Sequence, residues 1–177
     1  MKLTLDHNVI IDLAHGCANV ARLREILVAN EHEAYVVEMG ASEMRKMGVR
    51  PDRYDLFEEL LKQAGVESLP RLAPMMICDV TFWDHGLFAD ESMVELATQV
   101  ERVLFGQSES IDIAAERQDS SKYAAWLNRL CDVHTMWCHL HYKNEIFVTS
   151  DRNFHKSSKR PSLVSLGAGQ IRRPELL

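Results

Sequence analysis

The chain has 177 residues, of which 46% are hydrophobic and 26% are charged, and its net charge is −6. These values exclude disordered, collagen-like and coiled-coil proteins, because they match those of soluble globular domains. No apolar run is long enough to cross a bilayer, and Asp6 and Asp12 interrupt the apolar start, unlike a signal peptide. We expect a single cytoplasmic domain over 1–177, with no membrane association.

Strands and helices alternate in the predicted secondary structure. In the first half we expect a strand over 2–6, a helix from about Asn8, a helix over 19–29 capped by Asn19, a strand over 34–37, a helix capped by Ser42 and a helix opened by Pro51. In the second half we expect a connector over 65–74, a strand or buried extended stretch over 75–80, helices over 92–104 and 120–142, and strands over 146–149 and 163–166. This alternation predicts an α/β fold with a mainly parallel central sheet covered on both faces, and a helical elaboration at about 65–120.

The charge is unevenly distributed along the chain. Residues 1–142 carry 13 Lys and Arg against 23 Asp and Glu, whereas residues 143–177 carry 7 against 3. A basic C-terminal segment could contact phosphates while the acidic body holds cations, although a solvated tail explains the charge equally well. The four cysteines include no CxxC pair, so we expect free thiols.

Acidic side chains recur where strands are expected to end, and in an open α/β sheet ligands bind beyond those ends. Asp6 closes the first strand, Glu43 follows the second, and Asp151 follows the strand over 146–149. Asp132 lies in the preceding helix, where a buried carboxylate would be costly without a partner. Clustered carboxylates repel one another unless a cation is present, and the hard ions Mg²⁺ and Mn²⁺ prefer oxygen ligands. The pattern therefore predicts a divalent-metal site.

The order of these acids resembles the PIN-domain nuclease family. The matching features are a first strand that ends in Asp6 with Asn8 nearby, Glu43 after the second strand, Asp132 placed 19 residues before the last acid, and the closing run from Thr149 through Asp151 and Asn153 to Phe154. The resemblance covers about 1–47 and 128–155. It implies a PIN-like three-layer fold and a metal-dependent endoribonuclease that hydrolyses RNA phosphodiesters to 5′-phosphate and 3′-hydroxyl products.

The resemblance also implies roles for individual residues. Asp6, Asp132 and Asp151 would bind Mg²⁺ or Mn²⁺, directly or through water, and Glu43 would be a further ligand or orient the attacking water. The metal-binding carboxylates would be held in position by residues that do not themselves contact the metal, namely Asn8, Thr149 and Asn153. Asn153 stands where many members have a second Asp, which removes one negative charge. Many small PIN proteins are toxins that act as homodimers and are held by an antitoxin, so an antitoxin or regulatory protein and a homodimer are expected partners.

A basic group follows the last acid of the predicted site. It consists of Arg152, Lys156, Lys159 and Arg160. These side chains could hold RNA phosphates, which would give salt-dependent affinity without sequence specificity. A solvated loop has about equal weight. Trp83, Trp126 and Trp137 are expected to be core residues or partner-facing anchors.

Several of these positions have competing interpretations. Glu38 competes with Glu43 for the site, and Asp12 and Asp112 are weaker candidates, expected at the surface or in caps. His134 and His155 lie close in sequence to Asp132 and Asp151 and could line the site. A helical zinc cluster is a less favoured reading of a group of thiols and imidazoles, Cys131, His134, Cys138, His139 and His141.

Two other functions deserve comparison with a nuclease. Asp6-His7-Asn8 faintly resembles the aspartyl-phosphate phosphatases of the haloacid dehalogenase superfamily, but those enzymes need an Asp where Asn8 stands. A catalytically inactive PIN-like scaffold or partner-binding module is the more serious alternative. Retention of Asp6, Asp132 and Asp151 favours the enzyme, because a scaffold has no need to keep carboxylates together.

Overall fold

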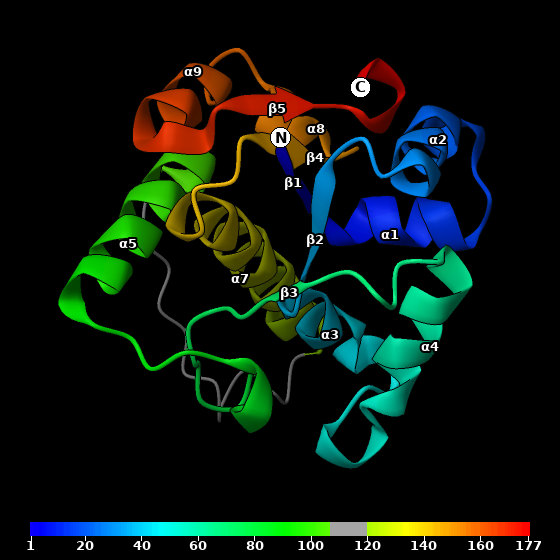
Figure 1. Ribbon diagram of the computed structural model, residues 1–177. Coiled ribbons are helices and arrows are strands. Elements are labelled where there is room, and N and C mark those ends of the chain that lie inside the picture. The colour runs from blue at the N-terminus through cyan, green and yellow to red at the C-terminus, as the bar shows by residue number, and fades with distance from the viewer. Residues whose placement is uncertain (107–119) are drawn as a thin grey trace.

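The computed structural model describes residues 1–106 and 120–177, and Asp112 lies outside these residues. Its described part contains a five-stranded parallel sheet with the order β3-β2-β1-β4-β5 (Figure 1). The strands are β1 (Lys2–Leu5), β2 (Glu33–Val37), β3 (Arg71–Leu72), β4 (Ile146–Val148) and β5 (Gln170–Arg172). The predicted α/β class with a parallel sheet is therefore confirmed.

The strand order places a topological switch point between β1 and β4. From β1 the chain adds β2 and β3 on one side, and then returns to place β4 and β5 on the other. Leu5 pairs with Val148 at the carboxyl ends of these two strands, and Asp6 N donates to Val148 O at 3.0 Å. Crevices that bind ligands in open α/β sheets form at this point, beyond the carboxyl ends of the strands.

Helices cover both faces of the sheet (Figure 1). One face carries α1 (His7–Ala14), α2 (Ala21–Ala29) and α4 (Asp55–Ala64), and the other carries α5 (Glu91–Phe105) and α7 (Ser120–His141). The remaining helices are α3 (Met39–Glu43), α8 (Arg152–His155), α9 (Arg160–Leu163), a π-helical turn (Val164–Ala168) and 3₁₀ helices at Ala18–Val20, Met44–Met47, Pro51–Arg53, Trp83–His85 and Pro174–Leu176.

Alternation along the strands sorts the core into two layers. Leu3 and Leu5 pack with α1, α2 and α4, whereas Val37 and Phe147 face α5 and α7. Trp137 is fully buried in the second layer and donates from Nε1 to Met93 O at 3.0 Å. Such a sandwich fixes α7 firmly against the sheet, so a side chain on α7 has a defined position relative to the strand ends.

Two of the expected strands are wrong. Residues 163–166 are helical, and the last strand is β5, which the chain enters through Gly169 at φ +56°. A Cβ at this glycine would lie 2.4 Å from Glu145 O, so only glycine fits there. Residues 75–80 are not in the sheet, because Met75 forms only an isolated bridge with Leu87. β3 lies instead in the expected connector, where its two residues are too few to produce a periodic pattern.

Two expected helix caps are also wrong. Ser42 lies inside α3, where its hydroxyl donates to Val80 O at 2.9 Å. Asn19 lies in a 3₁₀ helix before α2 and donates to Asp12 Oδ2 at 2.7 Å. In both cases a distant acceptor satisfies the side chain, which local sequence cannot reveal.

The region at about 65–120 contains β3, the 3₁₀ helix Trp83–His85 and α5, while residues 107–119 lie outside the described ranges. Among the helices that are described, none combines the length and hydropathy needed to span a membrane.

Candidate active site at the carboxyl edge of the sheet

Asp6 lies directly after β1 and is nearly buried, with 6% of its surface exposed. It caps α1, because its Oδ1 accepts from His7 N at 2.8 Å. Its Oδ2 accepts from Asn8 Nδ2 at 2.6 Å and from Thr149 Oγ1 at 2.5 Å. Burial raises the pKa of Asp6 to about 6, against the lowering effect of the Thr149, His7 and Asn8 bonds. The carboxylate is thus fixed in position but poorly solvated.

Asn8 and Thr149 join the ends of β1 and β4. Asn8 Oδ1 accepts from Ser150 N at 3.0 Å, and Asn8 Nδ2 also lies 3.3 Å from Thr149 Oγ1. Thr149 Oγ1 accepts from Asp151 N at 3.0 Å, so one hydroxyl contacts both strand-end acids. The two residues therefore hold Asp6 and the loop of Asp151 in a fixed relation.

Asp151 caps the short helix α8 through a bond from Asn153 N at 2.8 Å. The Asn153 side chain turns toward a cation, since its Oδ1 accepts from Lys159 Nζ at 2.5 Å. Lys159 also donates to Leu104 O. Burial and the neighbouring Lys156 lower the pKa of Lys159, whereas the charges of Asp151 and Asp132 raise it. Asn153 therefore supports a lysine that lies within electrostatic range of two site acids.

Asp132 and Glu43 complete the set from the α7 side of the sheet. Burial raises the pKa of Asp132 to about 8, with further increases from the negative charges of Asp6 and Asp151 and a decrease from Lys159. Burial also raises the pKa of Glu43, followed by the charges of Asp6 and Asp132, against Lys46. The four acids that the sequence predicts, from four different segments, are therefore brought within electrostatic range of one another.

His7 packs behind Glu43. Its Nε2 lies 3.7 Å from Glu43 Oε2, and its ring centroid lies 6.4 Å from that of Phe57. Burial lowers the pKa of His7 to about 4, so the imidazole is neutral at physiological pH. A Cβ at Gly40 would lie 2.7 Å from His7 Nδ1, so this approach requires a glycine.

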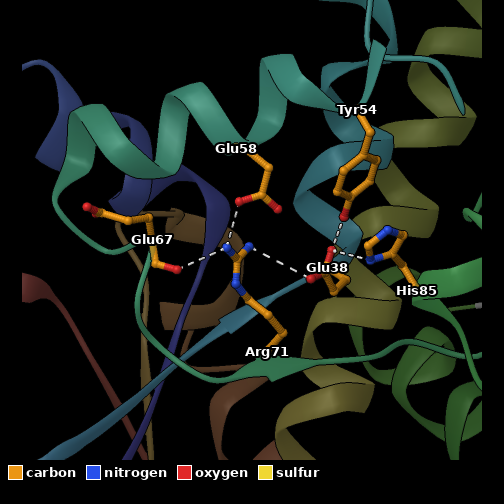
Figure 2. A network of polar contacts seen from close by, with 6 residues as sticks. All are labelled: Glu38, Tyr54, Glu58, Glu67, Arg71 and His85. Atoms are coloured by element: carbon orange, nitrogen blue, oxygen red, sulfur yellow. Dashed lines mark hydrogen bonds and ion pairs between the residues drawn. The ribbon is translucent and has the colours of Figure 1, made fainter. Parts of the chain in front are cut away.

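Glu38 follows β2 but belongs to a different environment. Figure 2 shows its carboxylate between the hydroxyl of Tyr54, which donates to Oε2, the imidazole of His85 and the guanidinium of Arg71. His85 Nδ1 lies 3.4 Å from Oε2, and Arg71 Nη1 lies 3.8 Å from Oε1. Arg71 Nη2 also donates to Glu58 Oε2 at 3.0 Å and to Glu67 O at 3.3 Å. The negative charge of Glu38 is thus compensated by Arg71 within the fold.

His139, Cys131 and Cys138 of α7 are buried in the core, and His134 Nδ1 is buried without a hydrogen-bond partner among the described residues. His139 donates from Nε2 to Ala168 O and accepts at Nδ1 from Thr4 Oγ1, each at 2.9 Å. Cys131 and Cys138 are fully buried, which raises the pKa of both thiols. Within residues 1–106 and 120–177, no three His, Cys, Asp or Glu side chains are arranged to hold a metal ion. Neither the thiols and imidazoles of α7 nor the four acids are therefore arranged as a metal site in this conformation.

Cationic side chains flank the acids on two sides. On the β5 side, a pocket of about 370 Å³ is lined by Arg160 together with His155, Arg172 and Arg173. Arg152 and Lys156 are exposed nearby in sequence. On the α3 side, a pocket of about 510 Å³ begins at Glu43 and is lined by three cations, Arg45, Lys46 and Arg50.

Sequence reasoning missed the α3-side cations. Their proximity in sequence to Glu43 was the available signal. No family model, curated protein or solved structure matches this chain. The chemistry of the site is therefore inferred from its own side chains.

Proposed function

We propose that the protein is a PIN-like endoribonuclease that hydrolyses RNA phosphodiesters with a divalent cation, Mg²⁺ or Mn²⁺. One observation supports this proposal: Asp6, Glu43, Asp132 and Asp151 lie within electrostatic range of one another near the switch point between β1 and β4. Burial, and then the charges of Asp6 and Asp151, raise the pKa of Glu43 and of Asp132. Four carboxylates repel one another when they are ionised, which destabilises the fold, and a bound cation relieves this repulsion.

The donor set fits a hard cation, because all four side chains offer carboxylate oxygens. Asp6, Asp132 and Asp151 would hold the ion. Asp6 is already fixed, so Asp132 and Asp151 would have to turn toward it, since no three of the described acids are arranged for a metal ion already. When bound, such an ion neutralises the phosphodiester charge and lowers the pKa of a bound water. Asn8 and Thr149 keep Asp6 from rotating freely, because they donate to the same Oδ2.

Glu43 is suited to proton transfer. Its raised pKa lets it hold a proton closer to neutral pH than an exposed carboxyl would. The neutral His7 lies against it at 3.7 Å and limits where the carboxylate can point. The flanking cations would hold the phosphates of the RNA on either side of the scissile bond: Arg45, Lys46 and Arg50 on one side, and Arg160, Arg172 and Arg173 on the other.

Calorimetric titration of Mn²⁺ into the wild type and into Asp132→Asn tests the proposal, with RNA cleavage measured on the same preparations. We expect the wild type to bind Mn²⁺ and cleave RNA, and the variant to lose both activities while remaining folded. Glu38→Gln is the matched control, because it changes a strand-end acid outside the proposed site. Absence of Mn²⁺ binding by the wild type would overturn the proposal and favour a PIN-like scaffold.

A further inference from the structure

A third pocket shares Arg45 with the α3-side pocket, and the rest of its lining comes from residues 51–85, which the PIN resemblance does not cover. It has a volume of about 390 Å³ and an aromatic lining that includes Tyr54, Phe82, Trp83 and His85. Trp83 is 76% exposed, although burying so large an apolar side chain would be favourable. Exposed aromatic side chains gathered around a pocket mark binding sites.

The rings of this pocket are held in place from behind. Tyr54 stacks on His85 with centroids 4.1 Å apart and an interplanar angle of 12°, and it packs edge-on against Phe82 at 5.1 Å. Tyr54 and His85 both contact the buried carboxylate of Glu38, which Arg71 anchors in turn (Figure 2). A pocket fixed in this way needs little ordering when a ligand enters, which favours affinity.

Arg45 connects the aromatic pocket with the acidic site. It lines both this pocket and the α3-side pocket that begins at Glu43. Its Nε donates to Val80 O at 2.9 Å, and its guanidinium lies 4.8 Å from the centroid of Phe82. Lys46 and Arg50 line the α3-side pocket with it. A path lined by cations therefore leads from the acids to the aromatic rings.

We propose that the pocket around Trp83 binds an unpaired base of a single-stranded RNA whose phosphates follow Arg45, Lys46 and Arg50 to Glu43. This inference rests on the proposed function, and it narrows the substrate to RNA with exposed bases. Aromatic rings beside a cationic path suit single strands, because every base offers a stacking face and every phosphate a negative charge. A duplex keeps its bases stacked inside and could not fill the pocket.

The acids of the pocket favour a base over a phosphate at this position. Asp79 and Asp84 are among its lining residues. Carboxylates repel a phosphate, but they accept hydrogen bonds from the exocyclic amino groups of cytosine, adenine and guanine.

Fluorescence anisotropy with a labelled 12-nucleotide single strand and a hairpin of the same composition tests the pocket, in EDTA so that no cleavage occurs. We expect Trp83→Ala to weaken single-strand binding by about tenfold or more, and Trp83→Phe to retain most of the affinity. Arg50→Gln should reduce the salt dependence by about one phosphate contact. Phe88→Ala is the matched control, because Phe88 is 82% exposed but does not line the pocket.

The possible results distinguish a failure of the proposed base pocket from a failure of the proposed nuclease activity. Unchanged binding by Trp83→Ala, equal loss in Phe88→Ala, or equal affinity for the hairpin would overturn the base pocket. Equal loss in Phe88→Ala would indicate that exposed aromatic side chains contribute to RNA binding without a pocket. RNA cleavage that depends on Asp132 with binding indifferent to Trp83 would leave the nuclease standing without the pocket. Binding that depends on Trp83 with no cleavage by the wild type would leave the pocket standing without the nuclease.

Discussion

Asp6 and Glu38 each follow a strand of the parallel sheet, but their surroundings differ. Glu38 has an arginine, a tyrosine hydroxyl and an imidazole around it. Asp6 accepts bonds only from uncharged groups, and Asp151 nearby raises its pKa further. The fold thus places a cation against Glu38. No cation contacts Asp6 among the described residues, and the cations that influence its neighbours Glu43 and Asp132, namely Lys46 and Lys159, act at longer range. Position at a strand end therefore does not distinguish the two acids, whereas the cation in contact with Glu38 does.

The largest expected effect is on RNA cleavage, and it should separate Glu43 from Glu38. Glu43→Gln should lower the cleavage rate by about 100-fold or more, because it removes a proposed proton-transfer group. Glu38→Gln should leave the rate at saturating RNA within a few-fold, because Glu38 contacts the rings of the aromatic pocket and not the four acids. A comparable loss of cleavage in both variants at matched folded fractions would contradict the division of the two acids.

The unfolding free energy should respond in the opposite way: Glu38→Gln should lower it more than Glu43→Gln does. Glu38→Gln removes one of the two carboxylates that Arg71 contacts in a partly buried network, and it should cost about 1–2 kcal/mol of unfolding free energy. Glu43→Gln removes repulsion by Asp6 and Asp132 and should be neutral or stabilising. Urea unfolding in EDTA measures both, and greater destabilisation by Glu43→Gln would refute the comparison.

The contrast between these acids shows which parts of the proposed site could be predicted from the sequence and which could not. Asp6, Glu43 and Asp151 were predicted because acids after strands can be read from local pattern, and the parallel sheet brings such ends together. Asp132 was predicted because a carboxylate inside an otherwise apolar helix is costly without a partner. The sequence could not separate Glu38 from Glu43, because the compensating Arg71 and His85 come from β3 and from beyond it. Arg71 was hidden in an expected connector, where a two-residue strand leaves no periodic signal.

The pocket around Trp83 was missed for a similar reason. Tyr54, Phe82 and Trp83 come from segments with no common motif, and only packing brings their rings together. Trp83 was expected to be in the core or facing a partner, and its exposure fits only the second of these. The sequence shows which residue types are present, but it does not show which distant side chains come into contact.

A smaller effect should appear in the pH dependence of stability without metal. The pKa of Asp132 is about 8 in the folded protein and 3.8 for an exposed Asp, so the folded state binds more protons between these values and stability falls as pH rises. His7, His134 and His139 have the opposite effect, because their pKa values of about 4 lie below the usual 6.5, but they act only between pH 4 and 6.5. From pH 6.5 to 8 the carboxylates therefore determine the slope.

We expect the unfolding free energy in EDTA to fall by about 1–2 kcal/mol between pH 6.5 and 8. Asp132→Asn should flatten this slope, and Mn²⁺ should restore the stability of the wild type at pH 8 if the acids bind it. A stability that rises over this interval in the wild type would show that the acids are compensated like Glu38, and the distinction between the two regions would fail.

The smallest expected effect comes from the uncharged groups that hold Asp6. Thr149→Val keeps the shape of the side chain but removes the donor to Asp6 Oδ2 and the acceptor of Asp151 N. The loss should cost about 1 kcal/mol of stability, and it should raise the pKa of Asp6 further, because that bond lowers it. The acidic limb of the cleavage profile should therefore move to higher pH. Thr149→Ser retains the hydroxyl and should leave both quantities close to wild type. If valine and serine at 149 behave alike, the hydroxyl has no part in tuning Asp6, and burial alone determines its protonation.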